Sequence, residues 1–220
     1  MKKYAIIVAG GSGVRMNSNI PKQFLLIKNK PVLFYTLQTF LNAYTDLYII
    51  LVLPQEHIAK GQEIIDGFFH TDRITIVAGG PTRFHSVQAG LSLIKDESII
   101  FVHDGVRCLV TAGLIERCHD AAEEHGNAVP AVTSKDSVRF IFDDITEPVD
   151  RNNILLIQTP QVFHSAILLA AYRIDYKDKY TDEATVVEAY GINPHIIPGE
   201  DNNIKITTPM DLLIAEQLLP

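Results

Sequence analysis

Near its start the chain reads Tyr4-Ala5-Ile6-Ile7-Val8-Ala9-Gly10-Gly11-Ser12-Gly13-Val14-Arg15-Met16. The run from Tyr4 to Ala9 is short and continuously apolar, which is typical of a strand buried on both faces of a parallel sheet. The glycines that follow allow a sharp turn and let main-chain amides approach a phosphate without obstruction by side chains. The stretch therefore predicts an α/β fold with an anion-binding loop after its first strand.

The same alternation of apolar runs and helical patterns continues along most of the chain, which favours a mostly parallel sheet with helices on both faces. The last helix has the clearest start, with Thr208 as N-cap, Pro209 at the first helical position and Asp211 at the third. The other expected strands are 47–53, 73–78, 98–102 and 128–132, and the other expected helices begin near Pro31 and Pro54 or span 84–94, 111–125, 165–173 and 182–190.

This rhythm breaks between residues 134 and 157. Ser137 to Phe142 and Ile154 to Ile157 have the composition of strands, but only a polar, acidic stretch joins them. Because that stretch is too short and too polar for a crossover helix, we expect an antiparallel pair that leaves the main sheet as an arm. Such a pair buries little by itself, so we expect a partner subunit to cover it. The chain is expected to form a single domain, 1–220, with this arm at about 134–157.

Composition narrows the class of protein. A length of 220 residues suits one α/β domain, and the net charge of −7 argues against a surface that coats nucleic acid. The first apolar run ends at Gly10, too early for a signal peptide, and no stretch approaches the roughly 18 to 20 apolar residues that span a membrane. Cys108 and Cys118 give neither a disulfide framework nor a zinc spacing. We therefore expect a soluble cytoplasmic protein with reduced thiols.

The glycine-rich loop does not follow the two most familiar phosphate-binding patterns. A Walker loop needs Gly-Lys-Ser/Thr after its spacer, which is absent. In a dinucleotide-binding fingerprint that starts at Gly11, Met16 stands where the third glycine belongs. No acidic residue follows a second strand about twenty residues on, as a ribose ligand would require. The loop therefore disfavours a dehydrogenase.

Two cations follow the glycines: Arg15, and Lys22 within Pro21-Lys22-Gln23. A triphosphate attacked at its α-phosphorus accumulates negative charge on its oxygens, and fixed cations stabilise that charge. Alone, each cation would be read as a solvated loop charge, the usual state of Lys and Arg. The whole pattern, Gly-Gly-x-Gly-x-Arg-Met and then Pro-Lys, resembles the signature of the sugar-phosphate nucleotidyltransferases.

Other motifs extend this resemblance over nearly the whole chain, and together they resemble the 2-C-methyl-D-erythritol 4-phosphate cytidylyltransferase family of the non-mevalonate isoprenoid pathway. The resemblance implies a Rossmann-like, mostly parallel sheet of the nucleotidyltransferase type. It also implies transfer of CMP from CTP to a polyol phosphate with magnesium, and a homodimer in which the arm completes the partner's site. The motifs are Gly79-Gly80 with Arg83 and Ser86, 103–107, 149–152, 158–161, 181–184 and 203–207.

The resemblance also implies residue roles. Arg15 and Lys22 match the stabilisers of the transition state, whereas Arg151 and Lys205 match the pair that positions the polyol phosphate. Ser137 stands where the family commonly has a threonine near that phosphate. The further matches are Gly80 and Ser86 facing the cytosine, Asp104 and Arg107 beside the ribose and the acceptor, and Ala9, Gly10, Gly11, Gly13, Gly105, Thr159 and Thr181 as other substrate contacts.

Three features of the sequence depart from the family pattern. Gly105-Val106 replaces a common Ala-Ala pair, a small change that backbone contacts should survive. Cys108 stands where a proline is usual, which leaves its loop less restrained. Pro81 replaces a usually polar residue near the base, so no side-chain contact is expected there.

The expected chemistry needs no general base, because the attacking oxygen belongs to an acceptor phosphate that is already anionic near neutral pH. Catalysis then depends on positioning and charge stabilisation. We expect His103 to orient the end of its strand and His85 to lie on a helix. Asp104, at the carboxyl end of a strand, lies where α/β sheets place ligands, although it could instead cap a loop. Magnesium is expected mainly on the CTP phosphates, with Asp104 as a possible ligand.

Three assignments have alternatives. Thr181-Asp182-Glu183 reads first as a helix start, with substrate contact as an addition. For the acceptor, ribitol 5-phosphate is the alternative, although the amino-acid sequences of 150–153 and 181–185 favour the erythritol family. A non-catalytic nucleotide-binding module is the alternative from another class, and the presence of Arg15, Lys22, Arg151 and Lys205 argues against it.

Overall fold

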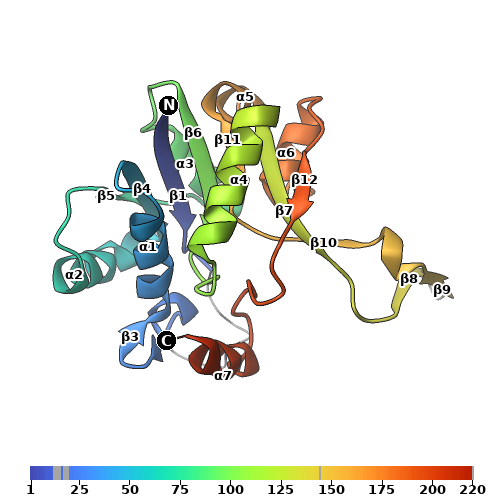
Figure 1. Cartoon of the computed structure of the whole chain (residues 1–220), viewed down its shortest axis with the longest axis horizontal. Helices are drawn as coiled ribbons and strands as arrows, with labels where there is room; N and C mark the ends of the chain where they lie inside the picture. Colours follow the sequence, from blue (N-terminus) through green and yellow to red (C-terminus); the bar gives the residue numbers. More distant parts are fainter. Residues whose placement is uncertain (12–15, 17–19, 144, 220) are drawn as a thin grey trace.

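The computed structural model describes residues 1–11, 16, 20–143 and 145–219. Its centre is an eight-stranded sheet in the order β10-β7-β11-β6-β1-β4-β5, with β12 beside β7 (Figure 1). The neighbours β6-β1-β4-β5 are all parallel, as the alternating sequence pattern predicts. The strands are β1 (Lys2–Val8), β4 (Leu47–Leu53), β5 (Ile74–Ala78), β6 (Ser98–Asp104), β7 (Asn127–Thr133), β10 (Leu155–Ile157), β11 (Gln161–His164) and β12 (Ile196–Pro198).

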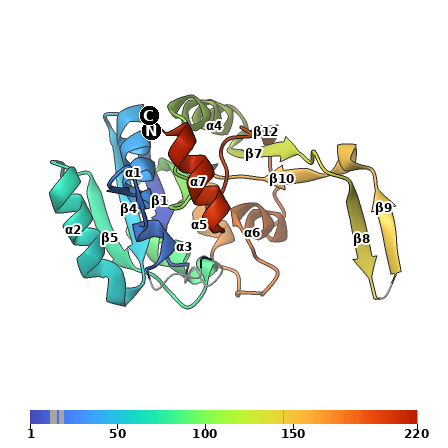
Figure 2. The ribbon, with the colours of Figure 1, turned by 90° about the horizontal axis from the view of Figure 1, so that it is seen from below.

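Helices cover both faces of the sheet, with α1 and α4 on one side and α3, α5 and α6 on the other (Figure 2). Successive side chains of a strand point to opposite faces of the sheet. They therefore pack alternately against the first layer, with α1 and α4, and the second layer, with α3, α5 and α6. On β1, Ala5 and Ile7 pack with the first layer, whereas Ile6 and Val8 pack with the second. The helices are α1 (Val32–Ala43), α2 (Ile58–Phe68), α3 (Arg83–Leu91), α4 (Ala112–His125), α5 (Ser165–Ala171), α6 (Glu183–Ala189) and α7 (Pro209–Leu218).

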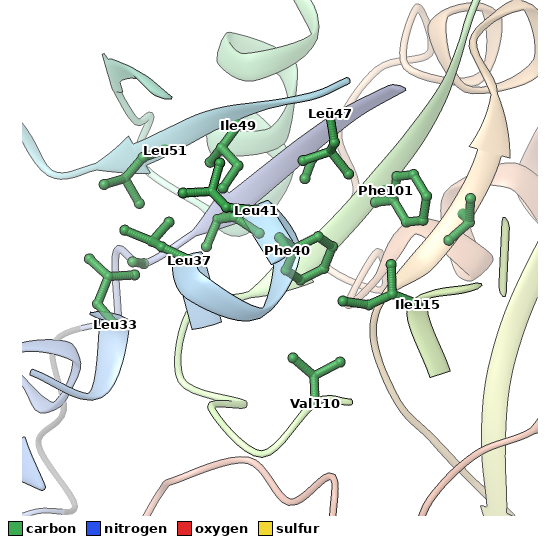
Figure 3. Close-up of a cluster of buried hydrophobic side chains, with 14 of the residues drawn as sticks. Leu33, Leu37, Phe40, Leu41, Leu47, Ile49, Leu51, Phe101, Val110 and Ile115 are labelled. Carbon is green, nitrogen blue, oxygen red and sulfur yellow. The ribbon is translucent and has the colours of Figure 1, made fainter. Parts of the chain in front are cut away.

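The larger core cluster lies between α1 and the sheet (Figure 3). Phe40 of α1 meets Phe101 of β6 edge-on, with ring centroids 6.1 Å apart. Leu33 and Leu37 of the same helix lie near Leu51 of β4 (Figure 3). This packing fixes the strands whose carboxyl ends carry the candidate site.

A third apolar cluster holds α7 beneath the sheet ends, with Ala215 packed near Ile206 and Val106. The predicted start of α7 is confirmed: Thr208 accepts the amide hydrogen of Asp211, and Asp211 closes a capping box. Short elements complete this region, namely the 3-10 helices η2 (Lys22–Phe24) and η3 (Gln55–His57) and the strand pair β2 (Leu26–Ile27) and β3 (Lys30–Pro31). Among the described residues, no helix is long and apolar enough to cross a membrane.

The arm is present, but its strand pairing differs from the expectation. β8 (Val138–Phe142) pairs with β9 (Ile145–Val149), a strand inside the stretch expected to be a connection. Ile154 to Ile157 was expected to pair with β8, yet its strand β10 returns to the sheet antiparallel to β7. The β9 sequence contains Thr146, Glu147 and Pro148, which are tolerated because within one chain neither face of this hairpin is buried. The hairpin extends away from the domain in both views (Figures 1 and 2).

Candidate active site

A cavity of about 550 Å³ opens at the carboxyl ends of β1 and β6. Residues Val8 to Gly11 line it after β1, residues Gly79 to Arg83 line it before and at the start of α3, and Asp104 lines it at the end of β6. This is the edge at which parallel α/β sheets bind their ligands. The cavity brings together Ala9, Gly10, Gly11, Lys22, Gly80, Ser86, Asp104 and Lys205 from the sequence-predicted set.

Lys22 enters this cavity from η2, directly after Pro21. The residue is 8% exposed, and its Nζ donates a hydrogen bond to the Ile206 carbonyl at 3.0 Å. Gln23 anchors the same turn by donating from Nε2 to the Ala9 carbonyl at 2.8 Å. The ammonium of Lys22 is therefore held next to the segment that carries Lys205. Arg15 and Gly13, the other charged and glycine positions predicted in this loop, lie outside the described residues.

The opposite wall of the cavity is a tight turn at Gly79 and Gly80. A Cβ atom at Gly80 would lie 2.4 Å from the Cβ of His85, so the close approach of the turn to α3 requires a glycine there. Ser86 accepts the Gly80 amide hydrogen at 3.2 Å and can donate to the Gly80 carbonyl at 3.4 Å. The turn thus presents backbone and hydroxyl groups of the kind that read the edge of a base.

Asp104, in the lining of the cavity, forms ion pairs with three cationic side chains. Its Oδ1 lies 3.3 Å from Nε of Arg83, and its Oδ2 lies 3.0 Å from Nζ of Lys205 and 3.5 Å from Nε of Arg107. Burial alone would raise the pKa of Asp104, but the charges of Arg83, Lys205 and Arg107 outweigh burial and hold the pKa well below its usual range. Asp104 therefore stays ionised and holds the ammonium of Lys205 at the cavity.

Behind Asp104, a relay of hydrogen bonds through the buried residues His103 and Thr159 orients the end of β6. Nε2 of His103 faces the Arg107 carbonyl at 3.2 Å, and since a carbonyl only accepts, this nitrogen carries the proton. Nδ1 then accepts from the Thr159 hydroxyl at 3.0 Å, while the Thr159 oxygen accepts the Asp104 amide hydrogen at 3.1 Å. Burial lowers the pKa of His103 to about 3, so the ring is neutral. His103 orients its strand end, as the sequence predicts, and His85 lies on α3.

Several predicted residues lie outside the described lining of the cavity. Thr159 is 4% exposed and serves the relay, and the Arg107 guanidinium donates to the Asn203 carbonyl at 2.8 Å. Gly105 packs against Ala9, because a Cβ there would lie 2.9 Å from the Cβ of Ala9. Thr181 precedes α6, whose N-cap is Asp182 rather than Thr181. One oxygen of the Asp182 carboxylate accepts the Thr185 amide hydrogen at 2.9 Å, and the other accepts from Gln161 on β11 at 2.9 Å.

Arg151 and Ser137 lie on the arm and not at this chain's cavity. Arg151 begins the 3-10 turn η4 (Arg151–Asn153), and its Nη1 donates to the Lys135 carbonyl at 2.9 Å. The structure of one chain therefore does not bring Arg151 together with Lys205. The arm that carries these residues extends away from the domain (Figure 1).

The structure pairs two residues, Arg83 and Glu183, whose ion pair the sequence does not predict. Arg83 lies in a quoted motif and lines the cavity, and its pair with Glu183 is the tightest ion pair at the site. Burial would lower the pKa of Arg83, but Glu183 and Asp104 raise it well above its usual value. The sequence indicates Glu183 only as part of a helix start. It does not predict the ion pair, because Arg83 and Glu183 lie 100 residues apart along the chain.

Comparison with known proteins gives a consistent result. A family model described as 2-C-methyl-D-erythritol 4-phosphate cytidylyltransferase matches residues 4–220. A protein of that name from Bacteroides thetaiotaomicron is 44% identical over 219 residues, covering 100% of both chains. One from Azobacteroides pseudotrichonymphae is 45% identical over 220 residues, covering 99% of both.

Solved structures agree with the family match. The crystal structure of 2-C-methyl-D-erythritol 4-phosphate cytidylyltransferase from Francisella tularensis has a TM-score of 0.82 at 31% identity, with 100% of both chains covered. The structure of 4-diphosphocytidyl-2C-methyl-D-erythritol synthase from Anaerococcus prevotii has a TM-score of 0.84 at 29% identity, covering 98% of this chain and 95% of that one. The likeness spans the arm as well as the domain.

Proposed function

The chain belongs to the 2-C-methyl-D-erythritol 4-phosphate cytidylyltransferase family, and from this premise we propose how its residues perform the reaction. It is a nucleotidyltransferase that transfers CMP from CTP to 2-C-methyl-D-erythritol 4-phosphate, giving 4-diphosphocytidyl-2-C-methyl-D-erythritol and diphosphate in isoprenoid biosynthesis. The relatives give no support to ribitol phosphate as acceptor or to a non-catalytic module. The observation that carries the mechanism is the position of Lys22, Lys205 and Asp104 on one cavity.

We propose that CTP lies along the loop from Ala9 to Gly11, with its base at Gly80 and Ser86 and its phosphates at Lys22. An acceptor phosphate oxygen attacks the α-phosphorus, and diphosphate leaves with the electrons of the broken bond. The ammonium of Lys22, buried beside the backbone of Gly11, can neutralise charge that develops on the phosphate oxygens. No proton has to be removed from the nucleophile, which agrees with a neutral His103 that lies outside the described lining of the cavity.

The acceptor phosphate is proposed to bind at Lys205. Two anionic substrates repel each other, so cations on the acceptor side lower the cost of their approach. Lys205 supplies one such cation from this chain. We propose that Arg151 and Ser137 supply further contacts from the arm of a second subunit, because neither lines the cavity of its own chain.

A homodimer is therefore part of the proposal. The arm hairpin exposes a cluster of large apolar side chains that one chain leaves uncovered: Phe140 at 65%, Ile141 at 73%, Phe142 at 70% and Ile145 at 65%. Exposed apolar patches of this kind mark protein interfaces. A second copy that covers the hairpin would remove this surface from water and bring Arg151 to the other active site. Cys108 and Cys118 are unpaired and buried, which fits the cytoplasmic location that we propose.

Magnesium is proposed to enter with CTP. Among the described residues, no group of three or more His, Cys, Asp or Glu side chains could hold a metal ion. Both oxygens of Asp104 already face cations, so Asp104 does not fit as the main ligand while Lys205 lies 3.0 Å away. Phosphate oxygens and water are the ligands that fit, which is a common arrangement for magnesium on nucleotides. The ion would supply charge neutralisation on the triphosphate.

Mixing two inactive variants tests the shared site. Lys22→Ala removes a cation of the cavity, whereas Arg151→Ala removes a cation of the arm. If the arm serves the other subunit, a mixed dimer contains one site that has both residues. Random mixing places about half of the chains in mixed dimers with one working site of two, so about a quarter of wild-type activity should return. Activity that stays at the level of the separate variants would contradict the shared site.

A further inference from the structure

Glu183 is fully buried at the start of α6, at 0% exposure, yet it lies outside the described lining of the cavity. Its carboxylate receives both terminal nitrogens of Arg83, with Nη1 to Oε1 at 2.5 Å and Nη2 to Oε2 at 2.9 Å. The hydroxyl of Tyr172 also donates to Oε1, at 3.0 Å. A buried carboxylate with this set of donors holds a guanidinium in one orientation.

The position of Glu183 is fixed from its own side as well. Gln161 on β11 donates from Nε2 to the Asp182 carboxylate at 2.9 Å and accepts the Ala184 amide hydrogen at 2.8 Å. The side-chain amide therefore ties down the residues on both sides of Glu183. Phe84 stacks on Tyr172 with ring centroids 4.6 Å apart, which also holds α3, the helix that carries Arg83.

This arrangement decides which atoms of Arg83 meet Asp104. Since Glu183 takes both terminal nitrogens, only Nε faces Asp104, at 3.3 Å from Oδ1. The other oxygen, Oδ2, then faces Lys205 at 3.0 Å, with Nε of Arg107 farther away at 3.5 Å. A guanidinium without a second partner prefers to bind a carboxylate through two parallel hydrogen bonds. Freed from Glu183, Arg83 would compete with Lys205 for Asp104.

We propose that Glu183 is a positioning residue for the acceptor phosphate. By holding Arg83, it keeps Asp104 divided between Arg83 and Lys205 and so keeps the Lys205 ammonium at the cavity. This inference rests on the proposed role of Lys205 in binding the acceptor. Glu183 acts through Arg83 and touches neither substrate.

Steady-state kinetics of Glu183→Gln, which removes the charge at nearly constant shape, tests this inference. We expect kcat/KM for the acceptor to fall by about 10- to 100-fold, as for a small displacement of a positioning group. KM for CTP should change by less than about threefold, because the Glu183 carboxylate makes its hydrogen bonds to Arg83 and Tyr172 and not to the groups assigned to CTP. Tyr172→Phe is the matched control, since it removes the other hydrogen bond to Oε1 and leaves every charge; it should lower acceptor use far less. A proportional loss for both substrates would overturn the proposal.

The double variant Arg83→Gln with Glu183→Gln provides the sharper readout. It removes one charge of each sign, so Arg83 no longer supplies a guanidinium that can compete with Lys205 for Asp104, and no uncompensated charge remains. The proposal predicts that the double variant uses the acceptor better than Glu183→Gln alone. Losses that simply add would overturn it. If Glu183→Gln does not fold, Glu183→Asp replaces it, because the side chain is one methylene shorter, so it keeps the charge but withdraws the carboxylate from the terminal nitrogens of Arg83.

Lys205→Ala separates failure of this inference from failure of the proposed function. If Lys205→Ala leaves acceptor use intact, the assigned role of Lys205 is wrong, and the inference about Glu183 fails with it. If Lys205→Ala weakens acceptor use but the double variant gives no rescue, the proposed function stands and the inference about Glu183 alone is wrong.

Discussion

The ammonium of Lys205 lies 3.0 Å from Oδ2 of Asp104, although β6 carries one residue and a loop near the end of the chain carries the other. The hydrogen bond from Lys22 to the carbonyl of Ile206 ties the same loop to η2. Lys22, proposed to bind the triphosphate, is therefore hydrogen-bonded to the residue next to Lys205, which is proposed to bind the acceptor. This connection holds the two cations at one cavity, where the proposed reaction needs both anionic substrates.

Lys22→Ala should lower turnover by about two to three orders of magnitude, by analogy with the loss of an oxyanion donor. The expected loss follows from the proposed role of Lys22, a fixed charge placed where negative charge grows during transfer. Diphosphate release at saturating CTP and acceptor measures the effect. Lys60→Ala is the matched control, because Lys60 is an exposed lysine paired with Glu63 at 2.7 Å. Undiminished turnover of Lys22→Ala would remove Lys22 from its assigned role.

The buried, neutral His103 should make stability depend on pH. Burial lowers its pKa to about 3 in the folded protein, whereas the unfolded chain has a value near 6.5. Between these values the unfolded state binds the proton and the folded state does not, so the free energy of unfolding falls as the pH is lowered. The contribution reaches about 1.4 kcal/mol per pH unit.

Urea unfolding between pH 4.5 and 6.5, compared for wild type and His103→Gln, measures that contribution. Asp104 does not add to the pH dependence of the free energy of unfolding in this range. Its pKa is lowered in the folded protein, so its contribution to stability changes only as the pH falls below the unfolded value of about 3.9. The slope with pH should be clearly smaller in His103→Gln. Equal slopes for the two proteins would show that His103 does not titrate between the folded and unfolded states as described.

Thr159→Val should destabilise the protein, because it removes the hydroxyl that joins His103 to the Asp104 amide. Two buried groups would lose their partner, at about 1–3 kcal/mol for an unsatisfied group. Thr159→Ser keeps the hydroxyl and should unfold close to wild type. Thr39→Val is the control, since its hydroxyl makes only a hydrogen bond within α1 to Tyr35. If the Val and Ser variants at 159 unfold alike, the relay does not support the site.

The sequence alone predicts those elements of the fold whose apolar residues recur at the spacing of a buried strand or helix face. The strand Leu47–Leu53 has the predicted bounds because both of its faces are covered. The capping box of Thr208 and Asp211 is likewise local, so its residues alone indicate it. Similarly, Lys22 and Asp104 reach one cavity because motifs at strand ends meet at one edge of the sheet.

Other features depend on contacts that no local pattern contains. β9 includes a proline and a glutamate and has no apolar period, since the hairpin is exposed in one chain. β11 is short and antiparallel, and the sequence does not predict it as a strand: only its first residue, Gln161, falls in a quoted motif. The ion pair of Arg83 with Glu183 joins α3 to α6, and only the packing of both helices on the same face of the sheet brings the two side chains together.

The most direct test of the central claim is diphosphate release from CTP with purified protein and magnesium, with 2-C-methyl-D-erythritol 4-phosphate and ribitol 5-phosphate offered separately. The structure and its relatives predict release with the erythritol acceptor, formation of 4-diphosphocytidyl-2-C-methyl-D-erythritol, and far less release when UTP, ATP or GTP replaces CTP. Transfer to ribitol 5-phosphate alone, or no release with either acceptor, would contradict the account.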